Sequence, residues 1–420
     1  MRSRAFVSSA FVVLWMISRY LMLLVWQNAA RYIRADVTYY FNQLEEQASG
    51  LQLVEYPTPV VWFLRVLHFV SGGDVDVFVA CFVAAMFLLD VAATAVLWFK
   101  AGRAAAVYWT LFIFCIGSLV WFRIDLIPAV AVCCALVWLL SKPVLSGASI
   151  AVGAAMKFWP ALLILPLVGA SESAKRRGLG FLVVGGLFGL TSLLVAGWER
   201  SVSPLTWQGD RGLQIESVLA SVPMARQAFD RSVFYEIRLS QYNAFEIKGP
   251  SVDFWTNLGD VLLPGVVVLA LGLGWLIGFG GVGLKNHSLG AVRSSSVDLR
   301  QQAMLWATTA VICAVIVANK TFSPQYVIWL AGPLSMLIAA RNTTSEDQVH
   351  ATVLGTLGLL VAILTQQIYP LNYIGLIQNP HNMASVTLLL LTRNAIMLLM
   401  TCWTVWRALQ LALAVGREVD

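Results

Sequence analysis

Charged residues are scarce in this chain: Lys, Arg, Asp and Glu make up only 12% of its 420 residues, whereas 59% are hydrophobic. A soluble domain carries about twice that charged fraction, so the composition argues against one. What remains is a series of apolar runs, most of which are long enough to cross about 30 Å of hydrocarbon as a helix. The sequence therefore predicts an all-α polytopic membrane protein.

The usual components of metal, disulfide and nucleotide sites are also missing. The four histidines are scattered, and the six cysteines lie inside apolar runs without metal-ligand spacing. No P-loop, dinucleotide-binding glycine pattern or nucleophile-elbow serine occurs in a suitable context. Asp74-Val-Asp76 superficially matches a motif for metal-bound nucleotide sugars, but its place at the mouth of a membrane span argues against that role. We expect no metal and no cofactor.

The net charge of +6 does not indicate a nucleic-acid partner, because the basic residues fall mostly between apolar runs and orient a membrane protein. The first run has no small-x-small cleavage site and is expected to be a retained helix rather than a removed signal. The orientation of the basic residues places loops 27–75 and 198–255 on the extracytoplasmic side. We expect residues 1–420 to form a single domain. The expected spans are 6–26, 76–98, 104–122, 124–140, 144–170, 178–197, 256–280, 302–318, 322–340, 349–369 and 384–407.

Segment 144–170 does not fit a single crossing. Lys142 and the cluster 175–177 (Lys-Arg-Arg) lie on either side of it, and both belong inside. Its centre contains Lys157 and Pro160, which are unfavourable inside a membrane helix. A hairpin of two short helices with Lys157 at its outer turn removes both conflicts, so we expect about 11–12 membrane helices.

Charged residues recur at the expected outer ends of the spans. Asp36, beside Arg34, follows the first span, and Arg123 and Asp125 lie between two spans with almost no loop. Ionisable groups near lipid are unfavourable by a few kcal/mol and are usually paired or functional. Arg123 and Asp125 could therefore form a salt bridge that pins two helix ends, or could bind substrate.

Lys320 lies between two nearly contiguous spans on the outer side, against the orientation rule for basic residues. The next helix would begin at Ser323-Pro324, so its free N–H groups and Lys320 could together hold a phosphate. Nonspecific binding of lipid headgroups by a snorkelling lysine is the alternative. The candidate catalytic residue is Asp36, and the candidate substrate-binding residues are Arg34, Arg123, Asp125, Lys157, Arg211, Glu216, Lys320, Gln325, Tyr326 and His381.

Several motifs occur in a fixed order along almost the whole chain. An acidic residue after the first span is followed by Tyr-Pro-Thr-Pro (56–59), Arg-Ile-Asp-Leu-Ile-Pro (123–128), Lys-Phe-Trp-Pro (157–160), Arg-Gly-Leu-Gln-Ile-Glu-Ser (211–217) and Asn-Lys-Thr-Phe-Ser-Pro-Gln-Tyr (319–326). This set resembles the actinobacterial GT-C glycosyltransferases that use polyprenyl-phosphate-mannose, a group that includes the phosphatidylinositol-mannoside and lipomannan alpha-1,2-mannosyltransferases.

The resemblance implies an inverting enzyme of the plasma membrane that acts on the extracytoplasmic face with an acidic residue of the first external loop as base, a position that Asp36 matches. The expected partners are a polyprenyl-phosphate sugar donor, a glycolipid or lipoglycan acceptor of the cell envelope, and membrane lipids. No residue separates mannose from arabinofuranose as the sugar. A lipid transporter and a non-catalytic scaffold are the other readings, although the polar residues gather at one face rather than at the midplane and no inverted repeat is visible.

Overall fold

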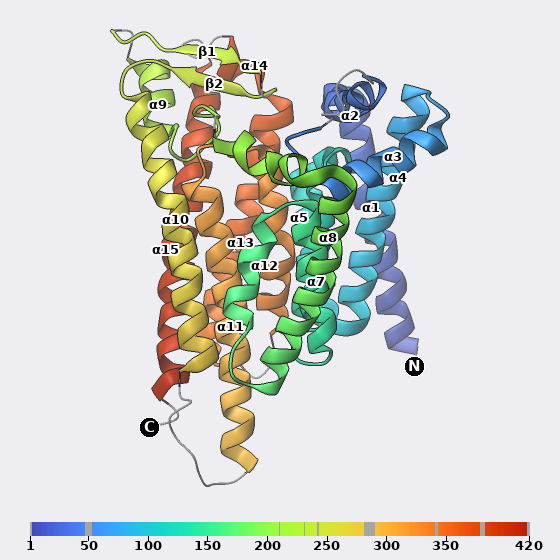
Figure 1. Ribbon diagram of the computed structural model, residues 1–420, viewed down its shortest axis with the longest axis vertical. Coiled ribbons are helices and arrows are strands. Elements are labelled where there is room, and N and C mark those ends of the chain that lie inside the picture. The colour runs from blue at the N-terminus through green and yellow to red at the C-terminus, as the bar shows by residue number, and fades with distance from the viewer. Residues whose placement is uncertain are drawn as a thin grey trace.

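The computed structural model describes residues 2–46, 53–209, 211–230, 232–241, 243–280, 290–340, 343–378 and 383–417. Most of its helices follow the long axis of the molecule (Figure 1). The start of α1 (Arg2–Ala29) and the last turns of α15 (Ala384–Arg417) lie at one end. The opposite end carries α2 (Ala35–Glu45) and a β-hairpin of β1 (Glu236–Leu239) and β2 (Phe245–Lys248). We call this the cavity end.

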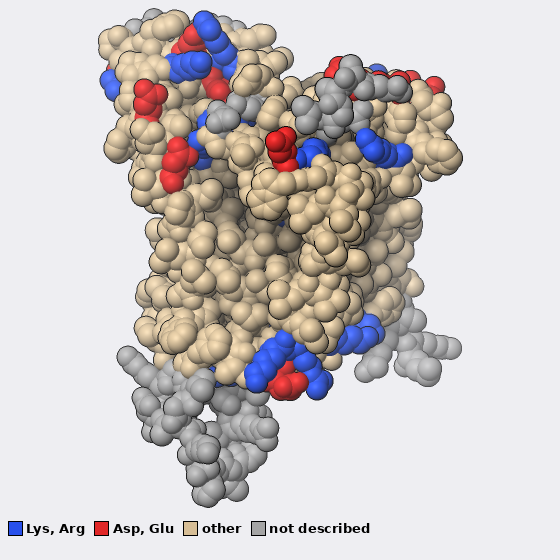
Figure 2. Space-filling model, in the orientation of Figure 1, with Lys and Arg blue, Asp and Glu red and all other residues tan. Residues whose placement is uncertain are grey.

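Eight of the described helical segments are long and apolar enough to cross a membrane. Figure 2 shows, on the face in view, a wide belt without charged side chains between two charged rims. This architecture is that of a polytopic membrane protein. The eight segments are Val7–Ala29 in α1, Val75–Ala101 (α4, Val75–Val96, with η2, Leu97–Ala101), Arg103–Phe122 (α5, Arg103–Ile116, with η3, Gly117–Phe122), Glu172–Trp207 in α8 (Glu172–Gly209), α10 (Val252–Phe279), Asp298–Ala318 in α11 (Gly290–Ala318), Ser345–Leu371 (α13, Ser345–Gln366, with η6, Gln367–Leu371) and Ala384–Val415 in α15.

Three of the expected spans are short or broken segments, and for 144–170 the break was expected. Prolines 160 and 166 lie in η4 and Pro324 begins η5, and a proline removes a backbone donor that a continuous α-helix needs. Of the expected 11–12 membrane helices, eight are long apolar helices within the described residues, and the count beyond these eight stays a prediction. The segments that replace 124–140, 144–170 and 322–340 are α6 (Leu126–Val137), α7 (Pro143–Met156) with η4 (Trp159–Leu167), and η5 (Pro324–Leu330) with α12 (Ala331–Ala339).

The chain reverses at Lys157, between α7 and η4. Helix α7 ends at Met156, and the backbone of Lys157 is extended, with φ −157° and ψ 132°. At the opposite end of these two segments, Arg177 Nε donates to Leu167 O (2.6 Å) and Arg177 Nη1 donates to Leu139 O (2.9 Å). One side chain thus holds the chain just before α7 and at the end of η4. The interruption expected from a lysine and a proline is present at this position.

The two expected outer loops are largely folded. Residues 27–75 contain η1 (Arg31–Arg34), α2 and α3 (Thr58–Ser71), and residues 198–255 contain the end of α8, α9 (Ser221–Phe229) and the hairpin. In the hairpin, Glu236 pairs with Lys248 and Leu239 with Phe245 in antiparallel register. The expectation of an all-α fold is corrected to a mostly helical chain with this small hairpin. The short α14 (Ile374–Ile377) also lies at the cavity end.

Helix α8 bends at Gly197, whose φ of 77° and ψ of 174° are not helical. A side chain is strongly disfavoured in this part of backbone space, so glycine is the residue that permits the bend. Beyond it, Pro204, Leu205 and Trp207 line the cavity described in the next subsection. The bend therefore brings the last turns of α8 over the cavity end.

Replacing Gly197 with alanine should lower the free energy of unfolding by about 1–3 kcal/mol, because the bend would be strained. The matched control is Gly186→Ala in the same helix, where an added Cβ meets no atom within 4 Å. That change should stabilise by about 0.5–1 kcal/mol, as alanine does inside a helix. Thermal unfolding in detergent measures both variants. Shifts of the same sign would contradict the assignment of Gly197 to the bend.

Candidate functional site

A cavity of about 750 Å³ lies at the cavity end, among segments that are far apart in the sequence. Its wall contains residues from η1, α2, the ends of α8 and α11, the upper part of α10 and the tip of the β-hairpin. Eight of the eleven residues predicted from the sequence line it together. They are Asp36, Arg123, Lys157, Arg211, Glu216, Lys320, Gln325 and Tyr326.

Asp36 lies in the first turn of α2 and forms an ion pair with Arg123, at 3.0 Å between Oδ2 and Nη2. The Arg123 side chain is only 3% exposed, and it also donates to Ile33 O and to the Tyr369 hydroxyl. Burial lowers the pKa of Arg123, but Asp36 together with the neighbouring tyrosines outweighs this, so the pKa lies above its ordinary value. Arg123 is therefore a permanent cation that orients a carboxylate which is 31% exposed to the cavity.

Asp125, two residues further on, does not pair with Arg123. Its Oδ1 accepts from Lys157 Nζ (2.7 Å) and from Trp329 Nε1 (2.8 Å), and its side chain is 2% exposed. Lys157 also lies 4.5 Å from the centre of the Tyr326 ring, a cation–π distance. The salt bridge between Arg123 and Asp125 that the sequence allowed is replaced by two separate pairs. Asp125 supports Lys157 from behind and is not part of the cavity wall.

Lys320 is held by a carboxylate that the sequence analysis did not identify. Its Nζ lies 3.0 Å from Asp260 Oδ1 on α10 and donates to Gly209 O at 2.9 Å. The Lys320 side chain is 8% exposed, whereas that of Asp260 is 55% exposed. Helix α10 can approach closely because residue 259 is glycine; a Cβ there would lie 3.3 Å from Lys320 Cβ and 2.9 Å from Leu219. Lys320 is thus a nearly buried cation with an exposed counterion.

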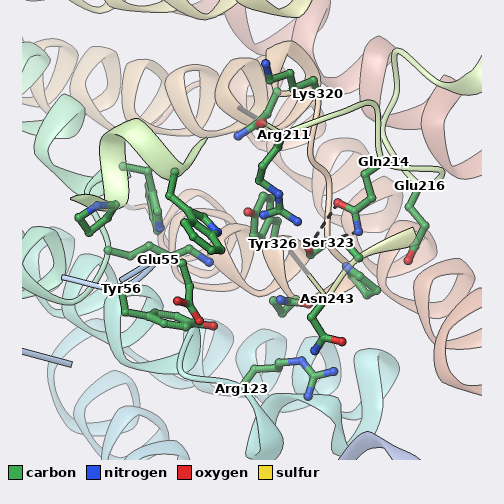
Figure 3. Close-up of a pocket in the computed structure, with 18 of the residues that line it drawn as sticks. Glu55, Tyr56, Arg123, Arg211, Gln214, Glu216, Asn243, Lys320, Ser323 and Tyr326 are labelled. Carbon is green, nitrogen blue, oxygen red and sulfur yellow. Dashed lines mark hydrogen bonds between the residues drawn. The ribbon is translucent and has the colours of Figure 1, made fainter. Parts of the chain in front are cut away.

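The motifs 211–217 and 319–326 meet at this wall. Gln214 N donates to Lys320 O (3.0 Å), and the side chains of Gln214 and Ser323 are hydrogen-bonded at 3.4 Å. Figure 3 shows Arg211 directed into the pocket between Lys320 and Tyr326. Ser323 makes no capping bond to the following helix, which begins as the 3-10 segment η5. The helix expected to begin at Ser323-Pro324 is present, as a 3-10 segment rather than a regular α-helix, so the phosphate cradle beside Lys320 stays a prediction. The cations Lys320 and Arg211 both line the cavity here.

Glu216 borders the cavity, but its carboxylate forms a buried ion pair. Its Oε2 accepts from Arg393 Nη1 at 2.8 Å, and both side chains are 0% exposed. Arg393 Nη2 and the Asn394 side chain bond the backbone oxygens of residues 216 and 217. In Figure 3, Glu216 points away from the centre of the pocket. Its contacts are those of a residue that ties the 211–217 motif to α15.

One further predicted residue, Arg34, is not in the cavity wall. Arg34 pairs with Asp76 at 2.6 Å, an exposed contact, and the Asp74 carboxylate accepts from Asp76 N and Val77 N to cap α4. The metal-like Asp74-Val-Asp76 pattern is therefore explained by helix capping and a surface pair. His381 lies outside the described residues.

Two carboxyl groups and a group of aromatic residues in the cavity wall were not predicted from the sequence. Besides Asp260, the wall contains Glu55, which accepts a hydrogen bond from the Tyr39 hydroxyl at 2.8 Å. Within the described residues, seven tyrosines line this cavity, and the clustering of four of them between residues 32 and 56 was a signal in the sequence. They are Tyr32, Tyr39, Tyr40, Tyr56, Tyr326, Tyr369 and Tyr373.

Comparison with known proteins adds no assignment. The chain matches no family model, no curated protein and no solved structure. Within the described residues, no group of three or more His, Cys, Asp or Glu side chains is placed to hold a metal ion. The chemistry of the cavity is therefore argued from its own side chains.

Replacing Glu216 with alanine should lower the free energy of unfolding by about 3–5 kcal/mol, because Arg393 would remain buried without its carboxylate. The control, Arg34→Ala, breaks an exposed pair and should change stability by only about 0–1 kcal/mol. Thermal unfolding in detergent compares the two. An equally small effect at Glu216 would instead favour a direct role in binding.

Proposed function

We propose that the protein is a membrane glycosyltransferase that moves a sugar, which we take to be mannose, from a polyprenyl-phosphate donor to a hydroxyl of a glycolipid or lipoglycan. One observation carries the proposal: a partly exposed carboxylate, Asp36, shares a cavity at one end of a membrane bundle with the cations Lys320 and Arg211. A base for a hydroxyl and cations for a lipid phosphate are the two requirements of this reaction. The order of motifs along the chain and the implied GT-C fold agree with it.

The charge distribution supports a cavity that faces away from the cytoplasm. Helices α5 and α8 and segment α7 all end beside residues of the cavity, and their opposite ends carry Arg103, the cluster 175–177 and Lys142. Basic residues concentrate on the cytoplasmic side of membrane proteins. We therefore assign the cavity to the extracytoplasmic side of the plasma membrane.

An apolar strip supports a lipid-linked donor. Leu263 and Val267 line the cavity on α10, about one and two turns beyond Asp260, and Val315 lines it on α11. A donor phosphate beside Lys320 would then have its prenyl chain against these side chains, along a helix long enough to cross the membrane. The charged and apolar parts of the cavity match the two parts of such a lipid.

The proposed reaction is a single displacement. An acceptor hydroxyl attacks the anomeric carbon while Asp36 takes its proton, and the bond from that carbon to the phosphate oxygen breaks. The polyprenyl phosphate leaves with the bonding electrons, and Lys320 and Arg211 stabilise its charge, so the step balances without a metal. Arg123 engages Oδ2 of Asp36, and we assign Oδ1 as the proton acceptor. Attack opposite the leaving group inverts the sugar.

Asp36→Asn should lower the rate of sugar transfer by about 10²–10⁴-fold, because asparagine cannot accept the proton. Asparagine keeps an oxygen for Arg123, so binding of polyprenyl phosphate should be unchanged. The control is Asp76→Asn, which alters a carboxylate that is 75% exposed outside the cavity. Initial rates with radiolabelled polyprenyl-phosphate-mannose, and with the arabinofuranose donor in parallel, measure the effect. Wild-type rates in the asparagine variant would remove Asp36 from the mechanism.

Lys320→Ala and Asp260→Asn should change the affinity for polyprenyl phosphate in opposite directions. The first removes a charged hydrogen-bond donor and should weaken binding by about tenfold or more. The second removes the carboxylate that competes for Lys320 and should tighten binding.

Tryptophan fluorescence titration in detergent is a suitable measurement, because Trp207 and Trp329 line the cavity. Asp253→Asn, at an exposed position of the same helix α10, controls for a general change of charge. Weaker binding in both test variants would indicate that Lys320 and Asp260 act only as a structural pair.

A further inference from the structure

The segment 53–57, before α3, is fixed by hydrogen bonds to its backbone. Arg200 donates to Leu53 O (2.9 Å) and to Tyr56 O (3.1 Å), and Ser203 Oγ donates to Val54 O (2.8 Å). Both donors come from the part of α8 beyond the bend at Gly197. Three of the four carbonyl groups of residues 53–56 thus accept hydrogen bonds from α8.

The same segment contains backbone strain. Leu53 has a φ of 51°, in the left-handed region that a branched residue rarely adopts. Such strain persists only where surrounding contacts enforce it, and it concentrates at functional sites. Glu55 lies between the residues Val54 and Tyr56, whose carbonyls are held, and it is the residue of this segment that brings a carboxylate to the cavity.

The Glu55 side chain has a defined orientation in the cavity. Its Oε1 accepts from the Tyr39 hydroxyl at 2.8 Å, and Tyr39 lies one helical turn after Asp36 on α2. In Figure 3, Glu55 and Asn243 approach the pocket from opposite sides. Burial raises the pKa of the Glu55 carboxyl, while its hydrogen bonds and the charges of Arg200 and Arg211 act in the opposite direction. The proposed displacement reaction does not involve Glu55.

The surroundings of Glu55 are aromatic. Tyr39, Tyr40 and Tyr56 line the cavity beside it, and the hydroxyls of Tyr40 and Tyr56 are hydrogen-bonded at 3.0 Å. An aromatic ring presents an apolar face to the C–H groups of a sugar, and a carboxylate offers about four lone-pair sites to its hydroxyls. A carboxylate among tyrosines is therefore suited to a polyhydroxylated ring.

We propose that Glu55 binds hydroxyl groups of a sugar in the cavity and so determines which sugar is accepted. Tyr39 fixes Oε1, and the remaining lone pairs of the carboxylate accept from neighbouring hydroxyls of the ring. The sugar belongs either to the donor or to the acceptor, because both must lie near Asp36. This inference rests on the proposed transferase function and adds a specificity-determining residue to it.

The test replaces Glu55 with glutamine, which retains an oxygen for Tyr39 but loses the charge. The KM for the substrate whose sugar Glu55 binds should rise about tenfold or more, as expected for loss of a charged hydrogen bond, and kcat should change less. A KM effect confined to the donor or to the acceptor identifies the source of the sugar. The control, Glu45→Gln, changes an exposed residue that pairs with His68 outside the cavity. Unchanged KM values for both substrates would overturn the proposal.

A binding measurement separates this proposal from the proposed reaction. Octyl mannoside, which carries the sugar without a phosphate, should bind wild-type protein and bind Glu55→Gln at least tenfold more weakly, while polyprenyl phosphate binds both equally. Glycoside binding that depends on Glu55 in a protein without transfer activity would reject the reaction and keep the sugar site. Transfer activity with equal glycoside binding by both proteins would reject the sugar site and keep the reaction.

Thermal unfolding distinguishes a sugar-binding role from a structural one. Because the folded state raises the pKa of Glu55, the unfolded chain releases this proton first, and stability falls as pH rises through the interval between the two pKa values. Glu55→Gln should therefore be at least as stable as wild type at neutral pH. A large loss of stability together with unchanged KM values would show that Glu55 only joins α2 to the segment 53–57.

Discussion

The arrangement of the cavity depends on the three-residue segment Arg123-Ile124-Asp125, whose two charges pair in different directions. Arg123 holds Asp36 of α2, and Asp125 holds Lys157 at the turn between α7 and η4. Leaving either group buried without its partner would be unfavourable by several kcal/mol. The segment therefore fixes the positions of α2 and of the turn between α7 and η4, and the cavity forms between them.

Three cations of the cavity share one feature, an ion pair with an aspartate. Arg123, Lys157 and Lys320 are each matched with a carboxylate, from Asp36, Asp125 and Asp260 respectively. The three carboxylates differ in exposure, from 2% for Asp125 to 31% for Asp36 and 55% for Asp260. The most buried is suited to support its lysine, the intermediate one to react with a hydroxyl, and the most exposed to yield its lysine to an incoming anion. Exposure thus separates three proposed roles for one residue type.

The sequence predicted the features that come from the energetics of single residues in a membrane. A lysine and a proline inside an apolar run indicated the break at Lys157, and charges near the ends of apolar runs indicated most of the charged residues of the cavity wall. The pairing of these charges was not predictable. Arg123 could pair with Asp36 or with Asp125, and the choice depends on how the chain folds in three dimensions. The family resemblance, found from ordered motifs, remains a prediction.

The residues that the sequence analysis missed are those whose role depends on distant partners. Asp260 lies inside the expected span 256–280, and its role comes from the ion pair with Lys320. Arg393 lies inside the expected span 384–407, and its role comes from the ion pair with Glu216. The four-residue strands of the hairpin are too short to give a clear alternating pattern. Glu55 lies in a segment whose conformation is set by Arg200, well over a hundred residues away.

The proposal that matters most is that the cavity transfers a sugar rather than moves a lipid. The direct measurement places purified wild-type protein in liposomes with radiolabelled polyprenyl-phosphate-mannose and octyl mannoside, and follows both the label and the prenyl lipid. We expect labelled octyl dimannoside and polyprenyl phosphate to form in equal amounts. Labelled donor that crosses the bilayer intact, with no sugar transferred, would contradict it.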